Sequence, residues 1–271
     1  MIVLAAAAHP DDIEFMMAGT LLRLKDAGCE IHLWNLANGC CGSNTLSREE
    51  AAAVRWSEAQ ASAALAGGTA HPPVFNDLEI YYDQPSLAKV AAVIRHIQPD
   101  IILTQSPQDY MEDHQNTVRV VVSGAFTRGM RNFPTDPAAA SYEKPVALYH
   151  ALPHGLKDSL RQPVEPHFCT DITAVLPRKR AMLAAHASQK QWLDETQGMD
   201  AYLDEMERMS AEVGRMSGTY EFGEGWRRHS HLGFAAEAFD PVRALLRTGQ
   251  WECLTFARMQ WRSRFCNTSR K

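Results

Sequence analysis

The amino-acid sequence predicts an α/β fold in which a mostly parallel sheet is flanked by helices. Short apolar runs, typical of buried strands, alternate along the chain with longer segments of helical character. The first run, residues 2–8, carries no charge and is followed at once by the polar sequence HPDD at residues 9–12. Open α/β sheets bind their ligands outside the carboxyl ends of their strands. We therefore expect one Rossmann-like domain with its functional site at the C-terminal rim of the strands.

The later elements continue this alternation. We expect strands at residues 30–36, 101–104, 145–151 and 168–175, a brief apolar run at 74–78, and helices at 15–25, 47–65, 87–98, 117–127 and 178–209. Ser47 and Glu50 form a capping box at the start of the helix at 47–65. The glycine-rich, polar segments at residues 37–47 and 218–233 are expected to be loops.

Composition and charge exclude several classes of protein. A chain of 271 residues with 45% hydrophobic content can bury a sizeable core, and its net charge of −5 does not favour nucleic acid or anionic membranes. No stretch approaches the roughly 18 apolar residues of a membrane span, and the start of the chain lacks the basic segment of a signal peptide. The six cysteines include no CxxC pair, as expected for reduced thiols. We expect a cytoplasmic protein that binds neither nucleic acid nor membrane, with homo-oligomerisation left open.

The polar cluster after the first strand has the chemistry of a metal site. His9 and Asp12 lie three residues apart on a tight turn, so both can reach one ion, and Asp11 is then free to act as a base. Imidazole and carboxylate are usual ligands of catalytic zinc. A competing interpretation is that Asp11 and Asp12 only cap the next helix. His114 follows the strand at 101–104 and can meet His9 at one rim of a parallel sheet, which makes it the expected third ligand.

The sequence AHPDDIE at residues 8–14 resembles the signature of the LmbE/PIG-L family of zinc-dependent N-acetylsugar deacetylases. Later sequences are similar to the family's motifs in the same order, namely EDHQNT at 112–117, DIT at 171–173 with Lys179, HASQ at 186–189 and AEAF at 236–239. The similarity extends from residue 2 to about residue 240. It implies a deacetylase domain over residues 1–240 and leaves residues 241–271 as a helical, basic C-terminal extension packed on it.

This resemblance implies a metal-dependent hydrolase that removes an acetyl group from an N-acetylglucosamine-type sugar or conjugate. His9, Asp12 and His114 would bind Zn²⁺, with Fe²⁺ or another divalent ion as the alternative, and Asp11 would be the general base. Two other functions stay open, namely a metal-dependent amidase acting on another amide or conjugate, and a non-catalytic sugar-binding protein. Intact ligands beside a base argue against the non-catalytic alternative.

The resemblance also suggests substrate contacts. The family has an arginine of an R..E pattern that faces the sugar, which makes Arg55 a candidate; a solvated ion pair with Glu58 is the competing interpretation. Tyr110 is a second candidate. Arg227 and Arg228 lie in the late polar segment, which would be either a lid facing the sugar or a basic surface loop.

One position departs from the family pattern. Many members have a second histidine three residues before the third ligand, acting as acid and oxyanion donor, and this chain has Met111 there. Asp113, which orients that histidine in such members, needs another partner because a buried carboxylate without one is costly. We expect His229 or His231 to contact Asp113 or the open side of the metal. Otherwise, the general base would have to serve as the acid as well.

Overall fold

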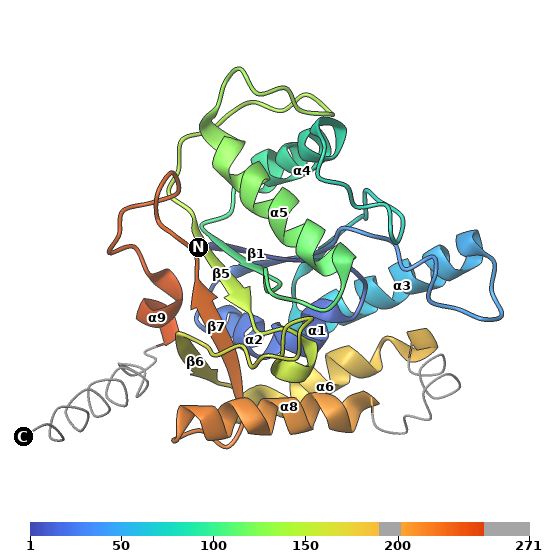
Figure 1. Ribbon diagram of the computed structural model, residues 1–271, viewed down its shortest axis with the longest axis vertical. Coiled ribbons are helices and arrows are strands. Elements are labelled where there is room, and N and C mark those ends of the chain that lie inside the picture. Colours follow the sequence, from blue (N-terminus) through green and yellow to red (C-terminus); the bar gives the residue numbers. More distant parts are fainter. Residues whose placement is uncertain (190–201, 247–271) are drawn as a thin grey trace, which may run out of the picture.

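The computed structural model describes residues 1–189 and 202–246 of the chain, and they contain a seven-stranded sheet in the order β3-β2-β1-β4-β5-β7-β6 (Figure 1). Strands β1 to β5 pair in parallel, whereas β7 runs antiparallel to both of its neighbours. The strands are β1 (Ile2–Ala7), β2 (Glu30–Asn35), β3 (Thr69–His71), β4 (Ile101–Thr104), β5 (Ala147–Ala151), β6 (Phe168–Asp171) and β7 (Gly223–Arg228). The expected α/β fold with a mostly parallel sheet flanked by helices is confirmed.

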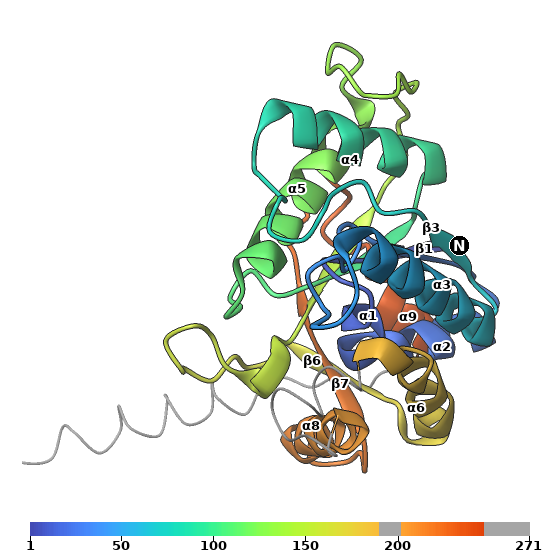
Figure 2. The same ribbon diagram turned by 90° about the vertical axis from the view of Figure 1, so that its right-hand side faces the viewer.

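Helices cover both faces of this sheet (Figures 1 and 2). One face carries α4 (Gln84–Ile97) and α5 (Glu112–Phe126), and the other carries α1 (Asp12–Met16), α2 (Ala18–Asp26), α3 (Arg48–Ala66), α6 (Leu176–Ala184), α8 (Tyr202–Ser217) and α9 (Pro241–Leu246). Successive side chains of β1 point to opposite faces of the sheet. Val3 packs in the cluster of α1 and α2, while Leu4 packs in the cluster of α4 and α5. A strand buried on both faces has to be apolar throughout, which explains the uncharged run at residues 2–8.

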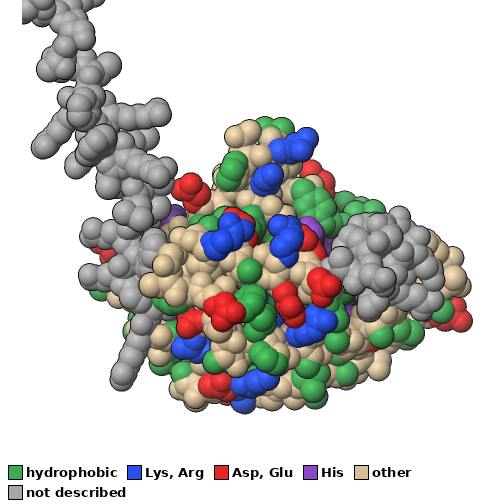
Figure 3. Space-filling view, turned by 90° about the horizontal axis from the view of Figure 1, so that it is seen from below, with side chains coloured by type: hydrophobic (Ala, Val, Ile, Leu, Met, Phe, Trp, Pro, Cys, Tyr) green, Lys and Arg blue, Asp and Glu red, His purple; other side chains and the backbone are tan. Residues whose placement is uncertain are grey.

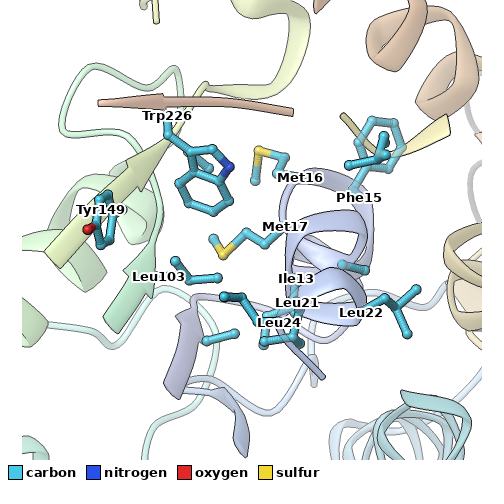
Figure 4. Packing of buried hydrophobic residues seen from close by; sticks show 14 of the residues in the cluster. Ile13, Phe15, Met16, Met17, Leu21, Leu22, Leu24, Leu103, Tyr149 and Trp226 are labelled. Carbon is cyan, nitrogen blue, oxygen red and sulfur yellow. The ribbon is translucent and has the colours of Figure 1, made fainter. Parts of the chain in front are cut away.

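The larger core lies between the sheet and α1 and α2 (Figure 4). Met16 and Met17 lie beside the fully buried Trp226, whose indole N–H donates to Thr20 Oγ1 over 2.9 Å. Complete burial of a large apolar side chain contributes about 1.5–3 kcal/mol. This packing holds the start of the chain, including the turn that follows β1, against strand β7, which comes late in the sequence.

The order of the strands creates a crevice at the rim. The chain runs outward from β1 through β2 to β3 and then returns to place β4 on the other side of β1. The helices after β1 cover one face and α5, after β4, covers the other, so the two connections diverge. A ligand site is expected at such a switch point, outside the carboxyl ends of β1 and β4. The sequences HPDD and EDHQNT both begin there.

The structure corrects the expected loop at residues 218–233, because residues 223–228 form strand β7 inside the sheet. Glu224 is buried and meets the ammonium group of Lys179 over 2.7 Å. Gly225 packs so closely on Leu152 that a Cβ there would lie 2.6 Å from Leu152 Cδ1. The polar and glycine residues that suggested a loop thus have interior partners.

Other boundaries also differ from the expectations. The apolar run at 74–78 contributes only an isolated bridge between Phe75 and Ala37, while β3 lies earlier in the chain. Helix α5 begins five residues before the expected residue 117, which places His114 in its first turn. The helix expected at 178–209 corresponds in part to α6 and α8, with residues 190–201 outside the described ranges. Of the expected C-terminal extension, residues 241–246 form α9 and residues 247–271 lie outside the described ranges.

Two observations concern the surface. Among the described residues, no helix has both the length and the apolar character needed to cross a membrane. On the face seen in Figure 3, acidic and basic side chains are interspersed with apolar ones. The described residues of that face therefore form no continuous basic patch of the kind that binds nucleic acid.

Candidate metal centre and active site

Three potential metal ligands meet at the rim. His9 follows β1, Asp12 begins α1 and His114 lies in the first turn of α5. One ligand atom of each lies within 4.8 Å of those of the other two. His9 Nδ1 is 3.5 Å from Asp12 Oδ2, and His114 Nε2 is 3.4 Å from Asp12 Oδ1. Two imidazoles and a carboxylate form a set typical of catalytic zinc sites that keep one position open.

Each imidazole of this set forms a hydrogen bond with a buried carboxylate through one ring nitrogen. His9 donates from Nε2 to Asp113 Oδ2 over 2.9 Å, and His114 donates from Nδ1 to Asp109 Oδ1 over 3.0 Å. Metal-ligating histidines almost always bind such an outer partner, which fixes the ring and its tautomer. The remaining nitrogen of each ring then faces Asp12. The residues present therefore fit a bound cation.

The electrostatics of the cluster also favour positive charge. Burial alone would lower the pKa of His9, but hydrogen bonds with Asp113 and Asp12 outweigh it and raise that pKa to about 10. Burial opposes ionisation of Asp12 as well, yet His114 and His9 hold its pKa well below the usual range. The carboxylates thus stabilise a cation at this place, which can be a proton or a metal ion.

Asp11 lies beside the cluster in an unusual backbone conformation, with φ 107°. A non-glycine residue with positive φ is strained, and such strain gathers at functional sites. Asp11 precedes α1 but makes no side-chain capping hydrogen bond, so the interpretation of Asp11 as a cap is wrong. Its Oδ2 instead accepts from the hydroxyl of Tyr202 over 2.6 Å. Burial raises the pKa of Asp11, while the nearby Arg55 and the hydrogen bond from Tyr202 act in the opposite direction.

Arg55 is buried at the floor of the site. Its guanidinium donates to the carbonyl of Pro10 and to the side-chain amide oxygen of Gln189, and lies 3.5 Å from Asp11 Oδ1. The expected alternative, an ion pair with Glu58, does not form, because Glu58 accepts from the backbone N–H and the hydroxyl of Ser188. Arg55 therefore ties the HPDD turn to the HASQ segment and fixes the carboxylate of Asp11.

A cavity of about 400 Å³ opens above these residues, a size that suits a small ligand. Tyr110 and Met111 line one side of it, and the loop at residues 37–47 contributes backbone at Gly39, Cys41 and Gly42. Asp77 shapes that loop, since its carboxylate accepts from the N–H groups of Gly39 and Cys41. The ring of Tyr110 is half exposed and stands edge-on to His114 at 5.6 Å between ring centres.

The late histidines do not reach this cavity. Asp113 accepts from His9 and from the backbone N–H of Leu78, so the expectation that His229 or His231 contacts Asp113 is wrong. His229 instead bonds to Nε2 of His150 over 2.9 Å. The reason lies in the pairing of β7 with β5, which continues to the backbone bond from His229 to Leu148 and keeps the ring there.

The two late arginines also lie outside the cavity lining. Arg227 donates to the side chain of Gln108, and Arg228 donates to the carbonyls of Glu237 and Phe239. The expected sugar-facing lid is therefore absent at residues 223–228, because these residues belong to the sheet. Arg228 supports the segment that leads to α9.

The cavity-lining residues that were not assigned to the site from the sequence include His154, Gln189 and Tyr202. Gln189 belongs to the HASQ motif, which was a usable signal, because His186 of the same motif lies 3.3 Å from Glu14, two residues after the HPDD turn. Tyr202 and His154 belong to no motif. Only the tertiary fold reveals that they face the cavity.

The fold and the site together define an α/β protein with a candidate metal centre of two histidines and one aspartate at the switch point of its sheet. Residues 4–125 match the sequence model of the PIG-L family, described as GlcNAc-PI de-N-acetylase. This match includes residues 8–14 and agrees with the resemblance drawn from them.

Several known proteins are similar to this chain. The diacetylchitobiose deacetylase of Thermococcus kodakarensis is 26% identical over 194 residues, which are 69% of each chain. The structure of N,N'-diacetylchitobiose deacetylase from Pyrococcus horikoshii has a TM-score of 0.70 at 23% identity, covering 89% of this chain and 88% of that one. The 4-carboxy-2-hydroxymuconate hydratase GalB from Pseudomonas putida has a TM-score of 0.68 at 19% identity, covering 84% and 96%. The two structures share the fold, although they are described as enzymes of different reactions.

Proposed function

We propose that this protein is a metal-dependent deacetylase that hydrolyses the acetamide of an N-acetylglucosamine-type sugar or conjugate. The observation that carries the proposal is the constellation of His9, Asp12 and His114 with a buried carboxylate, Asp11, beside it in a cavity of about 400 Å³. The PIG-L family match and the similarity to a diacetylchitobiose deacetylase support the acetamide as the bond that is cleaved.

The proposed ligands are His9, Asp12 and His114, and the proposed ion is Zn²⁺, because two nitrogens and one oxygen suit it. A divalent cation bound there would polarise the substrate carbonyl and lower the pKa of water from about 16 to about 7. Asp113 and Asp109 keep the two imidazoles oriented. Other borderline ions such as Fe²⁺ accept the same ligands.

Asp11 is the proposed general base. It lies next to the ligand Asp12 on the same turn, and Tyr202 and Arg55 hold its carboxylate in place. It accepts a proton from the attacking water and, when the C–N bond breaks, returns that proton to the departing amine. A single carboxylate can serve both steps because the proton that it takes is the one that the amine needs. Tyr110, with its half-exposed ring at the cavity, is a proposed contact for the sugar.

The first experiment measures acetate released from N-acetylglucosamine, diacetylchitobiose and other N-acetyl sugars, with and without a chelator. The expected result is release that the chelator abolishes and that added Zn²⁺ restores. His114→Ala should lose the bound metal and the activity, whereas His229→Ala, which changes a histidine outside the cavity, should keep both. Metal bound without acetate release from any sugar would refute the deacetylase and favour a hydrolase of another amide or a sugar-binding protein.

We further propose that the protein acts in the cytoplasm. The cysteines among the described residues, Cys29, Cys40, Cys41 and Cys169, are free thiols. Free thiols persist in a reducing compartment. Fractionation of the producing cells tests this proposal, and recovery of the protein outside the cytoplasm would refute it.

A further inference from the structure

His154 is held at the wall of the candidate active site by aromatic contacts. It begins the short 3-10 helix His154–Leu156 directly after β5 and Pro153. Its ring lies 4.8 Å from the ring of Phe15 and 6.2 Å from that of Tyr110, measured between ring centres. Tyr110 in turn stands edge-on to His114. His154 therefore lines the same cavity as the proposed metal ligands, from the segment after β5, which contributes none of them.

Within residues 1–189 and 202–246, the ring nitrogens of His154 have no hydrogen-bond partner and can bind a ligand. Neither forms a hydrogen bond with a residue in the described ranges, whereas His9 and His114 each have both nitrogens facing a carboxylate. A neutral imidazole carries one donor and one acceptor, and both need partners when they leave water. A half-buried imidazole at the wall of a polar cavity, without a hydrogen-bond partner among the described residues, is therefore suited to a hydrogen bond with a bound molecule.

We propose that His154 donates a hydrogen bond to the acetamide oxygen of the substrate and so fills the functional place that Met111 leaves open. The inference rests on the proposed deacetylase function. Met111 lines the cavity but its thioether cannot donate a hydrogen bond. Of the histidines that line this cavity, His154 is the one that neither belongs to the metal cluster nor bonds to a carboxylate.

The surroundings of His154 indicate that it acts as a neutral donor. Burial lowers its pKa, and the carboxylates of Glu205 on α8, Asp12 on α1 and Asp109 after β4 only partly offset this effect, while His114 on α5 adds to it. The imidazole is then uncharged near pH 7 and offers one N–H. A neutral imidazole can stabilise charge that develops on a carbonyl oxygen without giving up its proton.

With His154 as a hydrogen-bond donor, every proton that moves in the reaction has a donor and an acceptor. Water oxygen forms a bond to the acetamide carbon and loses a proton to Asp11, while the N–H of His154 stabilises the negative charge on the former carbonyl oxygen. Asp11 then passes its proton to the nitrogen and the C–N bond breaks. The products are acetate and the protonated amino sugar, since the second proton of the water leaves the newly formed carboxylic acid. His154 ends the cycle in the state in which it began.

Two variants separate hydrogen bonding from packing. His154→Phe keeps an aromatic ring against Phe15 but removes the donor, and His154→Gln keeps an N–H donor. Loss of one oxyanion donor typically lowers kcat by about 10²- to 10³-fold. We expect this loss in His154→Phe with unchanged metal content and melting temperature, and a partial recovery in His154→Gln. His229→Gln, which alters a histidine outside the cavity, is the matched control and should keep the wild-type kcat.

A binding measurement provides a readout other than turnover. The probe is the methylphosphonamide of glucosamine, whose tetrahedral phosphorus carries an oxygen where the oxyanion forms. Calorimetry should show about 10²-fold weaker binding of this probe to His154→Phe, in proportion to the loss of kcat, because the donor acts on the transition state. Glucosamine, the product without the acyl group, should bind both proteins equally. In the wild type, the imidazole proton resonance of His154 should shift when the probe binds.

The outcomes distinguish the inference from the function on which it rests. If wild-type protein releases acetate and His154→Phe retains its kcat and its affinity for the probe, the role of His154 is refuted while the deacetylase stands. If wild-type protein releases no acetate from any sugar, the proposed function fails first. If His154→Gln loses the alkaline limb of the pH profile of kcat/KM, His154 is a proton-donating acid and the neutral-donor assignment is wrong.

Discussion

The buried ion pair of Lys179 and Glu224 should contribute strongly to stability. Lys179 Nζ lies 2.7 Å from Glu224 Oε1, and their side chains are only 1% and 3% exposed. The same carboxylate accepts from the backbone N–H groups of Gly19 and Thr20, over 2.8 and 2.7 Å, and so caps the N-terminus of α2. Glu224→Gln preserves the shape of the side chain but removes its charge, which leaves the ammonium group of Lys179 unpaired.

The expected loss follows from this geometry. Removing one partner of a buried ion pair costs about 3–5 kcal/mol, because the other charge stays out of water without compensation. A domain has a total free energy of unfolding of about 5–15 kcal/mol, so the variant should lose a large part of it. Each kcal/mol lowers the melting temperature of a domain of this size by about 2–4 °C, which gives a decrease of about 6–20 °C.

Urea unfolding, followed by the tryptophan fluorescence to which the buried Trp226 contributes, measures this loss. Lys179→Met should also destabilise, and the double variant Lys179→Met/Glu224→Gln should lose less than the sum of the two, because it removes both buried charges. The exposed pair of Arg178 and Asp26, whose atoms are 2.9 Å apart, is the matched control, and Arg178→Met should cost less than about 1 kcal/mol. A cost below about 1 kcal/mol for Glu224→Gln, or strict additivity in the double variant, would refute the reasoning.

Three further predictions concern the site and the response to pH. Asp11→Asn should keep its metal but lose about 10²- to 10⁴-fold in kcat, whereas Asp12→Asn should lose its metal first. Elemental analysis measures the metal content, and acetate release measures kcat. The reverse pattern would show that base and ligand are exchanged. Asp113→Asn should weaken metal binding about 10- to 100-fold by releasing His9, as measured by competition with a chelator, and unchanged affinity would contradict the orienting role. Burial lowers the pKa of His150 from 6.5 to about 4. Between these pH values the imidazole of His150 is protonated in the unfolded chain but neutral in the folded protein. The stabilising contribution of His150 is therefore lost as the pH falls from about 6.5 towards 4. Urea unfolding at pH 7 and pH 4.5 should therefore show a smaller pH effect in His150→Gln than in the wild type, and equal effects would count against this assignment.

The part of the fold that the sequence predicted is the part in which burial alone selects residues. β1 and β4 lie inside the sheet and are covered on both faces, so their sequences are continuously apolar. β7 was missed because Gly223, Glu224 and Gly225 have the composition of a loop. The partner of Glu224 is Lys179, which is distant in sequence, so no local pattern could indicate that this carboxylate is buried within a strand.

In the site, too, some residues could be predicted from local sequence and others could not. The proximity of His9, Asp12 and His114 could be predicted because two of them share one turn and the third follows a neighbouring parallel strand. The role of each remains a prediction. The placement of His229 was wrong because it depended on the path of a strand that the sequence did not reveal. His154 was passed over because a single histidine after a strand has no distinguishing pattern.

The position of β7 between β5 and β6 has a consequence for how the protein forms during synthesis. The pairing of Tyr149 with Arg228 joins residues far apart in sequence, and such non-local pairing is slow. A nascent chain that has reached residue 222 can already pair β1 with β2 and β4, which bring His9 and His114 together, but it has no strand to place between β5 and β6. Unpaired strand edges are prone to association with other chains. A ribosome that pauses shortly before residue 223 would therefore hold a chain whose candidate metal ligands are nearly assembled and whose sheet has an open, aggregation-prone edge.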